Sequence, residues 1–84
     1  MKYYLYILKS LSRSSYYIGI TKDVNDRLKR HNSGQNKSTK GDKPYKLIYE
    51  EKFDNRIDAR EREKYLKSYA GVGEKRKIIS KFDK

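Results

Sequence analysis

The sequence predicts an α+β domain in which a small three-stranded sheet is flanked by helices. Three segments, residues 2–9, 16–20 and 45–53, are short and rich in Tyr, Ile and Leu, as strands are. A charged segment after the second strand, and a longer one after the third, carry the caps and the spacing of helices. The length of 84 residues indicates a single domain, which we expect to span 1–84.

The first two strands should pair antiparallel, because the polar connection 10–15 between them is short. In the first strand, alternation places Tyr3, Leu5 and Ile7 on one face and Tyr4, Tyr6 and Leu8 on the other. The second strand contains Gly19, and a glycine inside a strand often marks the close approach of another backbone or a ligand. We therefore expect a close contact at Gly19.

The first helix has an unusual inward face. It should begin after a cap at Thr21 or Asp23 and end before Gly34. Positions i, i+3, i+4 and i+7 form the stripe that packs on a core, and here two of the four are Arg27 and His31. A domain of this size buries few residues, so ionisable residues in those places need an explanation.

The second helix, predicted over 55–71 with Asn55 as its cap and Gly71 as its stop, shows the same feature. Its inward stripe is interpreted as Ala59, Glu63, Leu66 and Ala70. Glutamate is rarely buried unless it is paired or bound to a cation. Three ionisable residues from two helices therefore fall on faces that should be apolar.

Three further segments complete the expected fold. Strand 45–53 alternates so that Tyr45, Leu47, Tyr49 and Phe53 share a face. The tail 74–82 reads as a short helix that docks Ile78, Ile79 and Phe82. The loop 32–44 is rich in Ser, Asn, Gly and Lys and is long enough to be functional.

The charge of the chain favours nucleic acid as a partner. The formal net charge is +11, from 22 Lys and Arg against 11 Asp and Glu. An anionic membrane is a weaker rival, because no basic segment has a clean face of Trp, Phe and Leu and no apolar run could span a bilayer. The absence of cysteine excludes disulfide-linked partners and thiolate metal sites. No stretch resembles a signal peptide, so the expected location is the cytoplasm.

Two interpretations of Arg27, His31 and Glu63 are open at this point. In the structural one, Glu63 is a buried partner of Arg27, and His31 is a satisfied histidine at the edge of the core. In the functional one, the three groups share a pocket floored by tyrosines and suited to phosphodiester chemistry. An arginine offers a fork to two phosphate oxygens, a glutamate can hold Mg²⁺, and a histidine can donate or relay a proton near neutral pH.

Four motifs in a fixed order resemble a known family. They are "YLYIL" at 4–8, "YYIGIT" at 16–21, "RLKRH" at 27–31 and the glutamate of "REKYLK" at 62–67. Over residues 2–79 the chain resembles the GIY-YIG nuclease domain, in the small stand-alone form related to the N-terminal nuclease domain of the excision-repair incision subunit. The resemblance implies a three-stranded antiparallel sheet flanked by helices. It also implies a DNA endonuclease of repair or processing that cuts in one step with one divalent metal ion, Mg²⁺ or Mn²⁺.

Carried over position by position, the resemblance implies a catalytic set of Tyr6, Tyr17, Arg27, His31 and Glu63. Tyr6 belongs to the first tyrosine motif, and Tyr17 belongs to the second with Gly19. Arg27 would bind phosphate, and Glu63 would be the single metal ligand. For the general base, Tyr17 is the first candidate, with His31 or Tyr6 as alternatives or relays.

Two departures from the family pattern leave an alternative open. Tyr4 stands where the first motif has its leading glycine. No asparagine follows Asn55, although members often carry one after the glutamate helix. The main alternative is therefore a catalytically weak or inactive nucleic-acid-binding module on the same fold. A third interpretation is a protein-interaction domain whose charge only keeps it dissolved.

The residues expected to contact nucleic acid lie in the second strand, the loop and the tail. They are Gly19, Lys37, Lys40, Lys43, Lys75, Arg76 and Lys77. No segment resembles a base-reading helix, so recognition of DNA structure rather than DNA sequence is expected. The sequence leaves open whether the protein acts alone, as a homodimer or within a larger repair complex.

Overall fold

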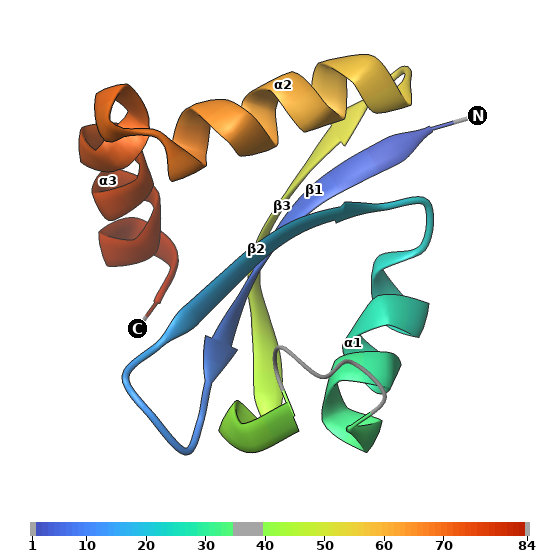
Figure 1. Ribbon diagram of the computed structural model, residues 1–84, viewed down its shortest axis with the longest axis vertical. Coiled ribbons are helices and arrows are strands. Elements are labelled where there is room, and N and C mark those ends of the chain that lie inside the picture. The colour runs from blue at the N-terminus through green and yellow to red at the C-terminus, as the bar shows by residue number, and fades with distance from the viewer. Residues whose placement is uncertain (1, 35–39, 84) are drawn as a thin grey trace.

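The computed structural model describes residues 2–34 and 40–83, which form a three-stranded antiparallel sheet with helices on both faces (Figure 1). The elements in chain order are β1 (Tyr3–Ser10), β2 (Tyr16–Thr21), α1 (Val24–Ser33), the 3₁₀ turn η1 (Lys40–Asp42), β3 (Tyr45–Phe53), α2 (Arg56–Lys67), the 3₁₀ turn η2 (Tyr69–Gly71) and α3 (Val72–Phe82). In the sheet, β1 lies between β2 and β3. The predicted α+β class and the antiparallel sheet are confirmed.

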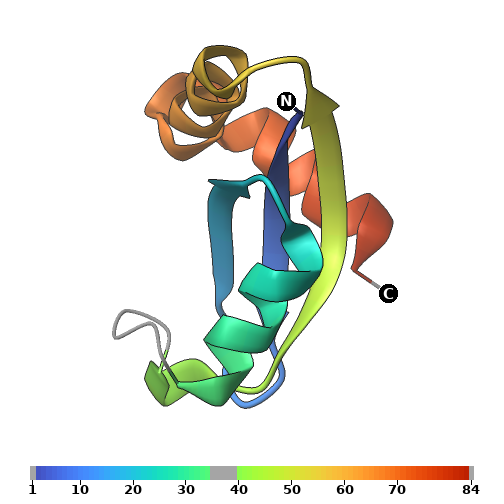
Figure 2. The ribbon, with the colours of Figure 1, turned by 90° about the vertical axis from the view of Figure 1, so that its right-hand side faces the viewer.

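The central strand β1 is covered on both faces. One buried cluster, on the side of α2 and α3, consists of Leu5, Ile7, Ile18, Leu66 and Ile78. The other, on the side of α1, consists of Tyr6, Leu8, Val24 and Tyr45. Figure 2 shows this layering, with α1 in front of the strands and α3 behind them. The alternation predicted for the first strand is confirmed, and it divides the apolar residues between two small cores.

The prediction that Tyr45, Leu47, Tyr49 and Phe53 share one face of the third strand is wrong. The pairing of β3 with β1 shifts by one residue at Ile48, which makes a β-bulge. Because strand side chains alternate with a period of two, one extra residue moves the remainder of the strand to the other face. Tyr45 and Leu47 therefore belong to the cluster under α1, whereas Tyr49 and Phe53 pack on the side of α2 and α3.

α1 begins and ends where the sequence predicts. The Asp23 side chain caps it by accepting a hydrogen bond from the backbone N–H of Asp26 at 3.0 Å, and Gly34 ends it with a left-handed φ of 83°. In its last turn, the Asn32 side-chain amide donates to the backbone carbonyl of Tyr45 at 3.0 Å. This contact joins the end of α1 to the first residue of β3.

α2 begins at its predicted cap, since the Asn55 side chain accepts a hydrogen bond from the backbone N–H of Asp58 at 2.8 Å. It ends at Lys67, before the predicted stop at Gly71. The serine after the helix caps the turn η2 and redirects the chain. Ala70 lies in that turn and is exposed, so its predicted place on the inward stripe is wrong.

Gly71 has a packing role instead of a capping role. Its backbone passes so close to α2 that a Cβ atom here would lie 1.9 Å from the carbonyl oxygen of Tyr65. The turn then leads into α3, which confirms the helix predicted for the tail but begins earlier, at Val72. Near the end of α3, the Phe82 ring packs with its centroid 5.0 Å from that of Tyr49.

We predict that Gly71→Ala destabilises the fold, because a methyl group has no room against the backbone of α2. The expected loss is about 1–3 kcal/mol in the free energy of unfolding, measured by urea denaturation. Gly73→Ala is the matched control, since a Cβ atom at Gly73 meets nothing within 4 Å and the residue lies in α3. The control should be neutral or more stable by about 0.5–1 kcal/mol. Equal stability of Gly71→Ala and wild type would contradict the packing role.

Candidate active site

Two tyrosines from the sheet and one histidine from α1 meet under the β2 edge of the molecule. The Tyr6 hydroxyl and Nε2 of His31 are hydrogen-bonded at 3.1 Å, and each of these side chains is only 1% exposed. The Tyr17 ring lies over His31 with a centroid distance of 4.6 Å and is 6.1 Å from the Tyr6 ring. The structure therefore brings together three residues that the sequence placed in one site.

Gly19 makes room for these tyrosines. It is paired with Tyr6 across β1 and β2, and a Cβ atom here would lie 2.7 Å from the Tyr6 hydroxyl and 2.9 Å from Cε1 of Tyr17. The close contact expected at Gly19 is therefore made by two aromatic side chains. Any larger residue would push at least one phenol away from His31.

Burial keeps the groups under this edge neutral. The pKa of His31 is lowered, first by burial and then by the positive charge of Arg27, so its imidazole is neutral at pH 7. The pKa of Tyr6 is raised far above its usual range, first by burial and then by the neighbouring Tyr17, while Arg27 opposes the shift. Arg27 is thus close enough to act electrostatically on both buried groups, and it is itself half-buried.

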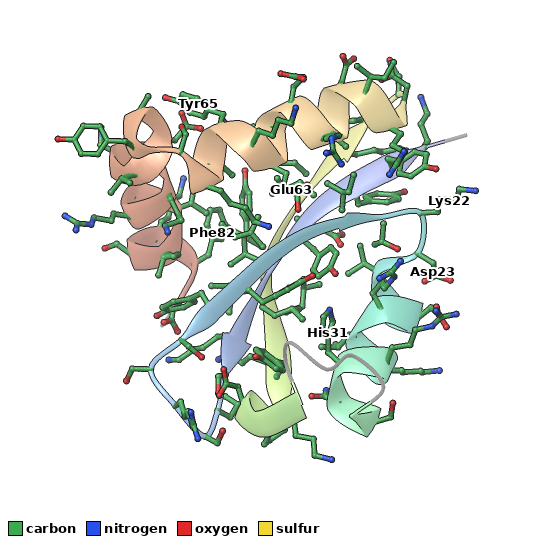
Figure 3. The ribbon with its side chains drawn as sticks, in the orientation of Figure 1. Lys22, Asp23, His31, Glu63, Tyr65 and Phe82 are labelled. Carbon is green, nitrogen blue, oxygen red and sulfur yellow. The ribbon has the colours of Figure 1, made fainter. Side chains whose placement is uncertain are left out.

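Glu63 approaches the same place from α2. Its negative charge contributes to the raised pKa of Tyr6, and its side chain is 18% exposed. Figure 3 shows Glu63 extending from α2, and His31 from α1, toward the region between the two helices. The carboxylate is therefore near the phenols and is open to solvent on one side.

The ion pair of Glu63 is with Lys67, at 3.1 Å from Oε2 to Nζ, and not with Arg27. The structural interpretation that paired Glu63 with Arg27 is therefore wrong. Lys67 was not singled out from the sequence, although its spacing of i+4 from Glu63 is the usual spacing of such a pair. The Lys67 Nζ also lies 5.9 Å from the centroid of the Tyr17 ring. The Lys67 ammonium therefore lies between the Glu63 carboxylate and the Tyr17 ring.

Glu63 is the residue that could hold a metal ion at this place. In residues 2–34 and 40–83 no three His, Asp or Glu side chains gather into a metal cluster. A single partly exposed carboxylate nevertheless fits Mg²⁺, which commonly takes one or two carboxylates and completes its shell with water and phosphate oxygens. Such an ion would have to compete with the Lys67 ammonium for the same oxygen.

The residues expected to contact nucleic acid are more widely spread. Lys37 lies outside the described residues, and so does the side chain of Lys40. Lys43 is exposed just before β3. Arg76 and Lys77 are exposed on α3 and Lys75 is partly buried there, on the side of the sheet opposite to α1. Of these cations, the three on α3 therefore lie on the other side of the sheet from Tyr6, Tyr17 and His31.

Comparison with known proteins identifies the class. The chain belongs to the GIY-YIG catalytic domain family, whose model matches residues 2–76. This membership supports a nuclease, with DNA as the substrate and a divalent metal of the kind that such nucleases generally use. In the described part of the chain, no helix has the length and apolar character needed to cross a bilayer.

The chain's relatives are small UPF0213 proteins. One from Staphylococcus saprophyticus is 40% identical over 80 residues, which is 94% of this chain and 95% of that protein. One from Staphylococcus aureus is 41% identical over 68 residues, which is 80% of this chain and 82% of that protein. The NMR structure of a UPF0213 protein from Bacillus halodurans is 31% identical, with a TM-score of 0.58 over 98% of this chain and 87% of that one. The resemblance to the small stand-alone form of the family is confirmed.

We predict that His31 titrates below the ordinary histidine pKa of about 6.5 and makes stability depend on pH. Because its pKa is lower in the folded state, the unfolded chain takes up the proton first as pH falls. The stabilisation is complete above pH 6.5 or so and is lost as pH falls toward the folded pKa. NMR titration of the ring protons measures the pKa directly, since the chain has one histidine.

The control is His31→Gln, in which urea denaturation between about pH 5 and 7 should show a smaller dependence of stability on pH. A folded-state midpoint at or above about 6.5 would show that the imidazole is not desolvated as described.

Proposed function

We propose that the protein is a metal-dependent DNA endonuclease that hydrolyses a phosphodiester bond by one-step attack of water. The observation that carries the proposal is that Arg27 of α1 and Glu63 of α2 both act electrostatically on Tyr6, whose hydroxyl is packed with Tyr17 and His31. A cation and a carboxylate beside a protonated phenol are the groups that a phosphate, a metal ion and a proton transfer require. Tyr17, Arg27 and Glu63 are each partly exposed, which leaves them accessible to a phosphate of DNA.

Arg27 and Glu63 have complementary tasks in this proposal. The Arg27 guanidinium would bind the scissile phosphate through two oxygens and offset the negative charge that develops on phosphorus. Glu63 would hold one Mg²⁺ or Mn²⁺ ion. Such an ion, when bound, stabilises negative charge on the phosphate oxygens.

Tyr17 is the residue that we propose as general base. Tyr6 is a poor base, because it is buried and its raised pKa keeps the hydroxyl protonated. His31 is neutral but is covered by the Tyr17 ring and hydrogen-bonded to Tyr6. Tyr17 is half-buried, and the Lys67 Nζ lies 5.9 Å from the centroid of its ring, so a cation stands beside the phenol that would accept the proton.

The proton balance follows from these assignments. The oxygen of water forms the new bond to phosphorus, and one of its protons passes to the deprotonated Tyr17 oxygen. The leaving oxygen of the DNA keeps the electron pair of the bond that breaks and then takes a proton from solvent water. Tyr6 and His31 act as positioning residues, because their hydrogen bond and the ring packing on His31 hold the Tyr17 phenol. In this proposal the cations of the protein would contact phosphates rather than bases, which fits recognition of DNA structure in repair or processing.

A binding module without turnover is the second candidate. The observation that favours it is the absence of any asparagine after Asn55. Nicking of supercoiled plasmid with and without Mg²⁺ separates the two candidates, because a binding module retains plasmid affinity but produces no nicked circles.

We predict that Glu63→Gln and Arg27→Ala each lower the rate of plasmid nicking by about 10²-fold or more, because each removes a group that stabilises the transition state. Circular dichroism should show that both variants remain folded. Glu50→Gln, at an exposed glutamate of β3, is the matched control and should cut at the wild-type rate. Wild-type rates for purified Glu63→Gln or Arg27→Ala would end the site assignment.

We predict that Tyr17→Phe lowers the rate by about 10²–10⁴-fold, the usual effect of losing a positioned base. It should also remove one ionisation from the pH dependence of the rate, because phenylalanine has no proton to lose. The measurement is plasmid nicking at saturating Mg²⁺ from about pH 6 to 10, with Tyr16→Phe as the exposed tyrosine control. A profile of unchanged shape would exclude Tyr17 as the base.

A further inference from the structure

A basic groove opens beside the candidate active site. It has a volume of about 330 Å³ and lies between the turn after β2, the helix α1 and the first residue of α2. Its charged lining residues are Lys22, Asp23, Asp26, Arg27, Arg30 and Arg56. Figure 3 shows Lys22 and Asp23 where β2 turns into α1. Arg27 lines this groove and also acts electrostatically on Tyr6 and His31, so it borders both the groove and the candidate site.

The two carboxylates of the groove are already engaged. Asp23 accepts the backbone N–H of Asp26 as the cap of α1. Asp26 pairs with Arg30 at 3.0 Å. In residues 2–34 and 40–83, no carboxylate makes an ion pair with the three other cations, which are Lys22, Arg27 and Arg56. Three cations, from the turn after β2, from α1 and from α2, therefore line one groove without an ion-pair partner among the described residues.

The groove is aligned with the candidate site along α2. Arg56, Arg60, Glu63 and Lys67 occupy positions i, i+4, i+7 and i+11, which form one row on a helix. At a rise of 1.5 Å per residue, Arg56 and Glu63 are about 10 Å apart along the axis. Phosphates of one DNA strand advance by about 3.4 Å along a duplex axis, so this separation matches about three nucleotides.

We propose that the part of the groove lined by Lys22 and Arg56 is a second phosphate site, which holds the DNA backbone about three nucleotides from the cleavage position at Arg27. The inference rests on the proposed function. Guanidinium groups match phosphate oxygens in pairs, and the row on α2 leads from the groove to Glu63. The site would anchor one strand on one side of the cut, so that Arg27 receives the scissile phosphate in register.

The test is DNA binding by Lys22→Gln, Arg56→Gln and the double variant, all on the Glu63→Gln background so that the DNA stays intact. Each lost phosphate contact should reduce the slope of log K against log salt concentration by about 0.9, and the double variant by about twice that. Lys46→Gln is the matched control, because Lys46 is exposed on β3 at the other edge of the sheet. Equal slopes for all these variants would overturn the phosphate site.

A second measurement locates the phosphate. In an oligonucleotide whose cut position has been mapped with the wild-type protein, single phosphates are replaced by neutral methylphosphonates. Replacement about three nucleotides from the cut should weaken DNA binding by the protein that retains Lys22 and Arg56. The same replacement should have little effect on DNA binding by the double variant, because the side chains that contact this phosphate are already absent. Additive effects at every position would contradict the proposal.

The outcomes separate this inference from the proposed function. If cleavage needs Glu63 and Arg27 but Lys22→Gln and Arg56→Gln do not change the salt slope, the endonuclease proposal stands and the second phosphate site is wrong. If these variants reduce the salt slope of DNA binding but the wild-type protein does not nick DNA, the phosphate site stands and belongs to a binding module. Absence of salt-dependent DNA binding by the wild-type protein overturns both.

Discussion

A buried hydrogen bond between the central strand and α1 holds the two sides of the candidate site together. The Tyr6 hydroxyl and His31 Nε2 meet at 3.1 Å where both side chains are almost fully covered. A buried polar group that loses its partner destabilises a protein by about 1–3 kcal/mol, so this contact ties the position of α1 to the sheet. Gly19 permits the contact, because any side chain there would collide with the Tyr6 phenol. Folding and site geometry therefore share one constraint.

The candidate site has a neutral buried centre, formed by Tyr6 and His31, and a charged rim, formed by Arg27, Glu63 and Lys67. Burial keeps Tyr6 protonated and His31 uncharged, whereas Arg27, Glu63 and Lys67 sit where water can still reach part of each side chain. This separation suits phosphodiester chemistry, since a neutral, packed centre fixes geometry while charged groups at the rim meet a charged substrate. Arg27 belongs to this charged set and also lines the basic groove beside α1, together with Lys22 and Arg56.

Local rules predicted much of this fold. Asp23, Asn55 and Gly34 mark helix ends because a cap needs only its own backbone and that of the next turn. Periodicity also pointed to the site: Arg27 and Glu63 are ionisable residues at positions where a small domain needs apolar ones. An ionisable residue at an inward helix position can be recognised from the sequence of that helix alone. The sequence therefore revealed both residues without any knowledge of the strands and helices that pack against them.

The contacts between distant segments could not be predicted in this way. The bulge at Ile48 depends on the pairing of β3 with β1, and it reverses the face of Tyr49. The role of Gly71 depends on how closely α3 approaches α2. The choice of Lys67 rather than Arg27 as the ion partner of Glu63 depends on where α1 lies relative to α2. Periodicity assigns a residue to a face, but packing between elements selects the neighbour it meets there, and that selection is a property of the folded chain.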